Sequence, residues 1–171
     1  MPDLVEVYTD EQIEQVTELA RRIWNQHYPM IIGQSQVDYM VERFQSSEAI
    51  RKQIKDGYQY FLIQSGTSNA GYAAVVPQLE RQCLQISKLY LLRAWRGKGL
   101  ARSVLGTFSA MAEDRGFSKL YLTVNKYNHS ALAAYRKLGF VRKGELVFDI
   151  GNGFVIDDYE MELDLSGFTK K

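Results

Sequence analysis

The sequence predicts a mixed α/β fold, with a mostly antiparallel sheet, one parallel strand pair in its middle and helices on both faces. Strand-like runs joined by short turns occupy residues 58–64, 70–76 and 82–92. A long amphipathic segment then separates residues 82–92 from another strand-like run at 119–124. A strand–helix–strand connection with a right-handed crossover makes those two strands parallel. Alternating runs at 141–148 and 154–165 predict a last antiparallel pair.

The N-terminal half predicts a strand, three helical segments and a hairpin. Residues 4–8 alternate like a strand, and Thr9 or Asp10 can cap a helix over 11–26. Ser35 is predicted to cap a second helical region, and residues 47–55 form a third that ends at Gly57. A polar turn at 65–69 joins the strands of the hairpin. With 171 residues, 46% of them hydrophobic, the chain is predicted to form one domain over 1–171.

The chain is organised around residues 87–116. A strand leads into a basic turn with two glycines, and an amphipathic helix follows, which Gly116 is placed to end. Such a turn directs free backbone N–H groups, and the positive end of the helix dipole, at one point. Gly97 and Gly99 allow positive φ and close approach of a ligand. The segment therefore predicts a phosphate site, with an ordinary surface turn as the alternative.

The local charge favours an anion at this turn. Residues 82–112 contain no Asp or Glu, although the whole chain has a formal charge of only +1. The cations in and beside this stretch are Arg81, Lys88, Arg93, Arg96, Lys98 and Arg102. The turn lacks the third glycine of the dinucleotide fingerprint and does not match a P-loop, which argues against both of those nucleotide sites.

Two motifs carry a family resemblance. Residues 96–101 match R-x-x-G-x-[G/A], and Asn128, Ala131, Tyr135 and the run Lys137-Leu138-Gly139-Phe140 match N-x-x-A-x-x-x-Y-x-K-L-G-F. In these residues the sequence resembles the GNAT superfamily of acyl-CoA-dependent N-acetyltransferases, most strongly over residues 86–140. The resemblance implies the fold described above, acetyl-CoA (coenzyme A) as the cofactor and a primary amine as the acceptor.

The resemblance also implies the roles of individual residues. Backbone groups of Leu89 and Leu91 would pair with the pantetheine arm as an added strand would. Tyr135 would be the general acid that protonates the departing thiolate, with helix packing as its alternative role. No metal is needed, because the thioester is already activated. The implied cofactor-binding residues are Leu89, Leu91, Arg96, Gly97, Lys98, Gly99, Leu100, Ala101, Asn128 and Lys137.

The general base and the acceptor are left open by the sequence. The strand before the turn carries no Asp or Glu, although some members of the superfamily place a carboxylate there, so His27, Asp158, Glu160 or a chain of waters could take the amine proton. Residues 145–164 hold seven carboxylates and no Lys or Arg, which indicates either a solvated sheet face or attraction of a cationic acceptor. The residues around 149–159 resemble a bacterial subgroup that includes polyamine acetyltransferases. Trp24, Tyr28 and Asp158 are candidate acceptor-binding residues, with core packing as the alternative for the two aromatic residues.

Two functions follow as hypotheses. The first is transfer of an acetyl group from acetyl-CoA to a primary amine of a small molecule, such as a polyamine, or of a peptide, by direct attack in a ternary complex. The second is a non-catalytic module that binds acyl-CoA on the same fold. We expect no nucleic-acid or membrane partner and a cytoplasmic location, with a homodimer as one option. One cysteine, Cys83, and two histidines argue against a disulfide framework and a zinc site.

Overall fold

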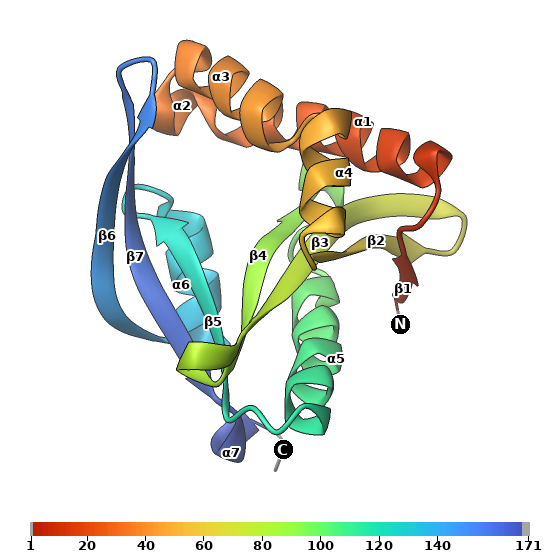
Figure 1. Ribbon diagram of the computed structural model, residues 1–171, viewed down its shortest axis with the longest axis vertical. Coiled ribbons are helices and arrows are strands. Elements are labelled where there is room, and N and C mark those ends of the chain that lie inside the picture. Colours follow the sequence, from red (N-terminus) through yellow and green to blue (C-terminus); the bar gives the residue numbers. More distant parts are fainter. Residues whose placement is uncertain (1, 169–171) are drawn as a thin grey trace. The chain divides into compact units, whose positions relative to one another are not determined.

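The computed structural model describes residues 2–168 (Figure 1). Its elements, in chain order, are β1 (Asp3–Glu6), α1 (Asp10–His27), α2 (Pro29–Ile32), α3 (Gln34–Phe44), α4 (Ser47–Lys55), β2 (Gln59–Ser65), β3 (Ser68–Gln78), the 3₁₀ turn η1 (Leu79–Arg81), β4 (Cys83–Leu91), the 3₁₀ turn η2 (Arg93–Trp95), α5 (Leu100–Asp114), β5 (Lys119–Asn125), α6 (His129–Lys137), β6 (Val141–Gly151), β7 (Phe154–Asp164) and α7 (Leu165–Phe168).

The strands form a seven-stranded sheet in the order β1-β2-β3-β4-β5-β7-β6. The pairs β1–β2, β2–β3, β5–β7 and β6–β7 are antiparallel, whereas β4 and β5 are parallel. The predicted mixed sheet, flanked by helices and with one parallel pair, is therefore confirmed. The described residues fall into two compact units, within Met1–Val76 with Lys88–Val104 and within Pro77–Ser87 with Leu105–Lys171. One domain over 1–171 stays a prediction.

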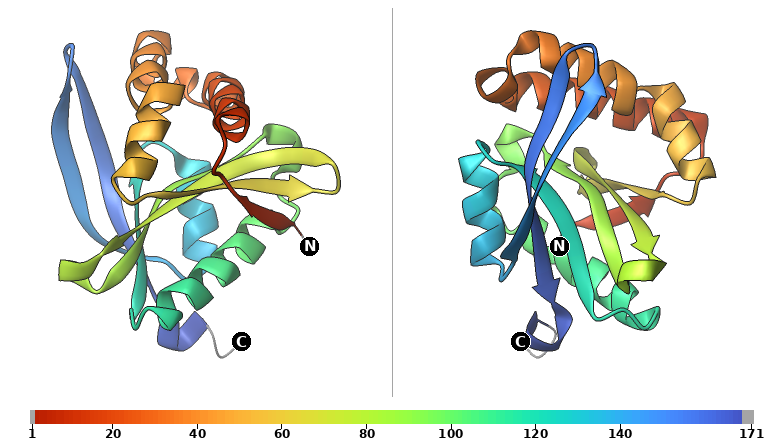
Figure 2. Two further views of the ribbon diagram at one scale, coloured as in Figure 1. Left: turned by 45° about the vertical axis from the view of Figure 1, so that its right-hand side comes forward. Right: turned by 60° about the vertical axis from the view of Figure 1, so that its left-hand side comes forward.

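In the first unit, α1, α3 and α4 cover one side of β2 and β3 (Figures 1 and 2). Apolar residues at helical spacing on α1, such as Ile13 and Ile23, pack with Val37 of α3 and Ile50 of α4 against the strands. Thr9 caps α1 in a capping box with Gln12, so of the two caps that the sequence left open, Thr9 is the one used. This core fixes the C-terminal end of α1 on the sheet.

The predicted cap at Ser35 is wrong. Helix α3 begins at Gln34, directly after Gly33, so Ser35 lies inside its first turn. Gly33 has a φ of 84°, a conformation that suits glycine. This glycine separates α3 from the four-residue helix α2, which the sequence analysis did not predict.

In the second unit, the first half of β4 pairs with β5, from Cys83↔Lys119 to Gln85↔Tyr121. The pairing then stops, although both strands continue within this unit. Asn128 caps α6 by accepting from the N–H of Ala131, and Gly139 follows the helix with a φ of 105°, as predicted. None of the helices in residues 2–168 combines the length and apolarity that a membrane span requires.

A buried lysine lies on β4 in the first unit. Lys88 is only 7% exposed, and its Nζ donates to Gln53 Oε1 at 2.7 Å. The same Gln53 oxygen accepts from the Tyr60 hydroxyl at 2.5 Å. Burial lowers the pKa of Lys88 from 10.5 to about 7, because the ammonium loses its hydration there. Lys88 is thus a cost to folding rather than an exposed cation.

This lysine predicts a pH-dependent stability. Between a folded pKa of about 7 and an unfolded pKa near 10.5, the unfolded chain binds more protons, so stability rises with pH across that range and is lowest below pH 7. Lys88→Met should raise the free energy of unfolding at pH 7 by on the order of 2–4 kcal/mol and flatten this rise. Urea unfolding from pH 6 to 10 measures both effects. The exposed Lys55→Met is the matched control, and a less stable Lys88→Met protein at pH 7 would contradict the argument.

Candidate functional site

The turn between β4 and α5 has the predicted strand–turn–helix geometry. After η2, Arg96 is extended, Gly97 has a φ of 73° and Gly99 a φ of 81°, and α5 begins at Leu100. The first N–H groups of a helix have no intrahelical partner, and the 15-residue α5 adds the positive end of its dipole. The two glycines therefore turn the chain so that an anion can lie on these N–H groups.

Both glycines leave the backbone open. No atom lies within 4 Å of the position that a Cβ would take at Gly97 or Gly99. The side chain of Leu100 is buried and anchors the start of α5, whereas Lys98 and Arg102 are exposed beside the turn. This arrangement fits a phosphate group, which needs close access to backbone N–H groups and nearby positive charge.

Four of the six cations that the sequence analysis counted have protein partners. In the second unit, Arg81 pairs with Glu160 at 3.4 Å. In the first unit Lys88 is buried, Arg93 Nη2 donates to the carbonyl of Gln26 at 2.6 Å, and Arg96 Nε donates to the carbonyl of Leu91 at 3.1 Å. Arg93 and Arg96 keep their positive charge in these bonds, because a carbonyl group is neutral, and Arg93, Lys98 and Arg102 are exposed. Arg81, which is paired with Glu160, and Lys88, whose pKa is lowered to about 7, are the two that contribute less positive charge than the sequence suggested.

Aromatic residues gather where α1 meets the end of β4. Trp24 is 4% exposed and stacks on the half-buried Tyr28, with ring centroids 4.3 Å apart. Tyr90 of β4 contacts Trp24 edge-on at 5.5 Å. Trp24 thus belongs to the core of the first unit, in agreement with the alternative that it is a packing residue. Tyr28 is partly buried against that core. Leu89 and Leu91 are half-buried on β4, and the Leu91 carbonyl already accepts the bond from Arg96.

The second motif lies on α6 in the second unit. Asn128 is buried as the N-cap, and Lys137 is exposed in the last turn of the helix. Tyr135 is half-buried, and its ring contacts Phe140 edge-on with centroids 5.4 Å apart. The motif residues thus have a structural role at the cap and the end of α6.

Asp158 stands out among the carboxylates of β7. It faces Asn125 in the β5–β7 register, and burial raises its pKa from 3.8 to about 6, against a lowering effect of a hydrogen bond with Thr123. The neighbouring Asp157 is paired with Lys126 at 2.7 Å. A carboxylate with a pKa of about 6 is mostly ionised at pH 7 and can accept a proton from a neighbouring group.

The rest of the acidic strand is less solvated than a plain alternating pattern suggests. Met161 and Leu163 are buried on one face, as predicted. On the other face, Glu160 contacts both the Tyr121 hydroxyl and Arg81, and Glu162 pairs with Lys119 at 3.2 Å. Most of these charges are thus matched within the second unit.

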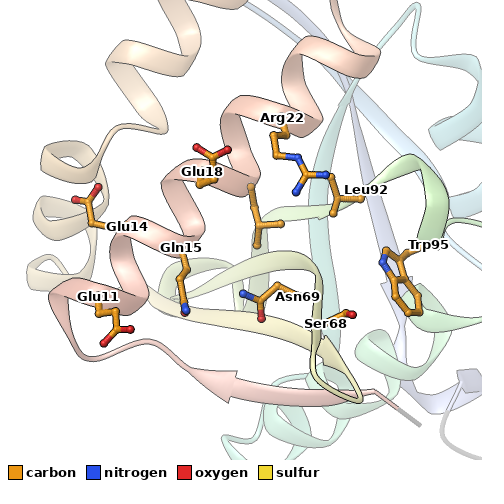
Figure 3. A pocket seen from close by; sticks show the side chains of 10 residues that line it. Glu11, Glu14, Gln15, Glu18, Arg22, Ser68, Asn69, Leu92 and Trp95 are labelled. Carbon is orange, nitrogen blue, oxygen red and sulfur yellow. The ribbon is translucent and has the colours of Figure 1, made fainter.

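The first unit also has an open groove of about 620 Å³ (Figure 3). Its lining residues are Glu11, Glu14, Gln15, Glu18, Leu19 and Arg22 of α1, Ser68 and Asn69 of β3, and Leu92 and Trp95. Glu18 pairs with Arg21, and Glu14 accepts from the Ser47 hydroxyl, so these acids already have partners. Within residues 2–168, no group of three or more His, Cys, Asp or Glu is arranged to hold a metal ion.

The sequence analysis did not identify three residues that contact site or buried charges. They are Gln26, which contacts Arg93, Gln53, which contacts Lys88, and Thr123, which contacts Asp158. Gln26 and Arg93 are 67 residues apart, and no local pattern in the sequence marks such a pair.

The geometry agrees with a comparison against protein families. The model of the acetyltransferase (GNAT) family matches residues 13–140. The chain belongs to this family. The match includes the turn before α5, the cap of α6 and Tyr135, which are the segments that the resemblance in sequence identified.

Relatives of this GNAT chain include an uncharacterized N-acetyltransferase of Mycobacterium tuberculosis, 36% identical over 81 residues. That alignment covers 47% of this chain and 51% of the relative, so the chain spans about half the length of the curated relatives that it matches.

Among solved structures, the PaiA N-acetyltransferase of Thermoplasma acidophilum, in complex with coenzyme A, is similar with a TM-score of 0.77 and 18% identity, covering 96% of this chain and 99% of that one. Mutant forms of the spermidine/spermine N-acetyltransferase SpeG of Vibrio cholerae give a TM-score of 0.69 and 19% identity, covering 99% and 96%. These likenesses show the fold.

Proposed function

We propose that this GNAT protein transfers an acetyl group from acetyl-CoA to a primary amine of a small molecule, such as a polyamine, or of a peptide, by direct attack in a ternary complex. The observation that carries the proposal is the turn between β4 and α5, with its two positive-φ glycines and open backbone. Family membership supports the same activity.

The cofactor proposal assigns the pyrophosphate of acetyl-CoA to the backbone N–H groups of residues 96–101. Lys98 and Arg102, which are exposed, would supply positive charge, in addition to the guanidinium groups of Arg93 and Arg96, which also donate to carbonyl groups of the protein. Backbone groups of Leu89 and Leu91 would pair with the pantetheine amides, and Asn128 and Lys137 keep the cofactor-binding roles that the resemblance implies. The T. acidophilum protein, which shares the fold, was crystallised with coenzyme A.

The chemistry needs one proton donor and one proton acceptor. Acetyl-CoA supplies an acetyl group activated as a thioester, so the amine nitrogen forms the new bond to the carbonyl carbon while the carbon–sulfur bond breaks. Tyr135 would donate its phenolic proton to the departing sulfur. Asp158, whose pKa is raised to about 6, would accept the proton that the amine loses.

A cationic acceptor is supported by the acidic end of β7 and by the likeness in fold to the V. cholerae spermidine/spermine N-acetyltransferase. Lys126 neutralises part of the charge of Asp157, which leaves Asp158 as the more effective attraction for an amine. The cytoplasmic location, the absence of nucleic-acid and membrane partners, and the option of a homodimer remain predictions.

Gly99→Val tests the phosphate turn. A β-branched residue is strained at a φ of 81°, so the turn should shift and coenzyme A should bind about 30-fold more weakly, or about 2 kcal/mol, by calorimetry. Gly66→Val is the control, because Gly66 also has a positive φ and open space, but lies in the β2–β3 hairpin. Equal affinities of Gly99→Val and wild type would show that the turn is not the phosphate site.

Tyr135→Phe tests the general acid. It keeps the ring against Phe140 and removes only the proton donor, so turnover with spermidine and acetyl-CoA should fall by about 10²-fold, with coenzyme A affinity unchanged. Thiol release measures turnover, and the exposed Tyr127→Phe is the control. Unchanged turnover, in a regime where chemistry limits the rate, would leave Tyr135 a packing residue. A wild-type protein that binds coenzyme A but acetylates no amine in a broad panel would favour the non-catalytic module.

Asp158→Asn separates attraction from proton transfer. If Asp158 attracts the acceptor, KM for a diamine such as putrescine should rise several-fold, and the effect should shrink with salt, since charges are screened over about 8 Å at physiological ionic strength. If it is also the base, kcat should fall, and wild-type activity should drop as pH decreases through about 6, where the carboxyl becomes protonated. Asp164→Asn, exposed on the same strand, is the control. Better turnover of neutral or acidic amines would refute the cationic-acceptor proposal.

A further inference from the structure

The C-terminal end of α1 is bonded to the turn that precedes α5. Arg93 Nη2 donates to the backbone carbonyl of Gln26 at 2.6 Å, and the Arg93 N–H donates to Gln26 Oε1 at 3.3 Å. One residue pair, 67 positions apart, is therefore joined through both a side chain and a backbone group of each partner. Next to it, Arg96 Nη1 lies 3.5 Å from His27 Nδ1. Both contacts lie within the first unit.

The charges at this contact favour a response to an anion. The guanidinium of Arg93 lies at the negative end of the α1 dipole, where the last carbonyls have no helical partners. Burial, and secondly repulsion by Arg93, lower the pKa of Arg96, so two like charges are held close together. An anion on the nearby N–H groups of α5 would offset that repulsion and favour the bonded arrangement.

The segment beyond this contact is only partly buried, with Tyr28 and Ile32 packed against the core of the first unit. Helix α2 has four residues, contains no buried residue and ends at Gly33, and Met30 is 96% exposed. Tyr28, the residue between α1 and α2, stacks on Trp24. A short helix with little burial opens locally at low cost, so its order depends on the contacts at its ends.

We propose that the contact between Arg93 and Gln26 couples anion binding at the β4–α5 turn to the order of residues 26–33, which makes Arg93 a positioning residue. The inference rests on the proposed function, in that the anion is the pyrophosphate of coenzyme A. Its consequence is that coenzyme A bound at the turn would rigidify a segment containing Tyr28, a candidate acceptor-binding residue.

Hydrogen exchange with mass spectrometry tests this coupling, with coenzyme A as the probe, saturating for each protein. In wild type, coenzyme A should slow amide exchange about 10-fold or more both in residues 96–103 and in 26–33. The variant Arg93→Gln lacks the charge and one donor group. In this variant, coenzyme A should slow amide exchange in residues 96–103 only. Gln26→Ala, which keeps the carbonyl, should lose part of the effect on 26–33. Arg22→Gln, the same substitution at an exposed arginine of α1, should behave as wild type.

Any of the following results would overturn the proposal. If coenzyme A protects 96–103 but never 26–33, or protects both equally in Arg93→Gln, the coupling is refuted while the cofactor site stands. If Arg93→Gln no longer binds coenzyme A at any concentration, Arg93 is a phosphate ligand instead. If coenzyme A protects neither segment of the wild-type protein, the cofactor site itself fails, and the coupling fails with it.

Discussion

Two glycines between the end of β4 and the first residue of α5 set the geometry on which the proposed site depends. Gly97 has a φ of 73° and Gly99 a φ of 81°, and no atom lies within 4 Å of the position that a Cβ would take at either residue. A residue with a Cβ adopts this conformation only at a cost, and it would also stand between a ligand and the backbone. Positive side chains are secondary here, because the backbone itself offers the donors and the dipole.

The side chains around the turn are divided between two tasks. Arg93 and Arg96 donate to carbonyl groups of Gln26 and Leu91, whereas Lys98 and Arg102 are exposed. A guanidinium suits the first task because its planar fork can satisfy carbonyl groups in a fixed direction. The same contacts join the strand, the turn and the end of α1, and the proposed coupling to residues 26–33 would act through them.

Much of the fold could be predicted from local pattern. The helical spacing of apolar residues located α1 and α5, the capping residues Thr9 and Asn128 located two helix starts, and the strand–helix–strand order made β4 and β5 parallel. The burial of Lys88 and the partners of Arg93 could not be predicted in this way, because each depends on residues that only the folded chain brings together. The count of six cations overstated the available positive charge, because Arg81 is paired with Glu160 and burial lowers the pKa of Lys88. Whether the predicted site residues act together stays a prediction, since family motifs identify residue types and not their measured roles.

Burial sets Asp158 apart from the other carboxylates of β7. Glu160, Glu162 and Asp157 are each matched by a cation, which reduces their long-range attraction for an amine. Asp158 differs because desolvation dominates its environment and raises its pKa to about 6. At pH 7 the carboxylate form still outweighs the acid by about ten to one, so Asp158 would attract an ammonium group and then accept its proton. A fully solvated Asp would attract equally well but would be a weaker base, and an uncharged amide such as Asn could do neither. Partial burial is therefore what fits this one carboxylate for both roles in the proposed reaction.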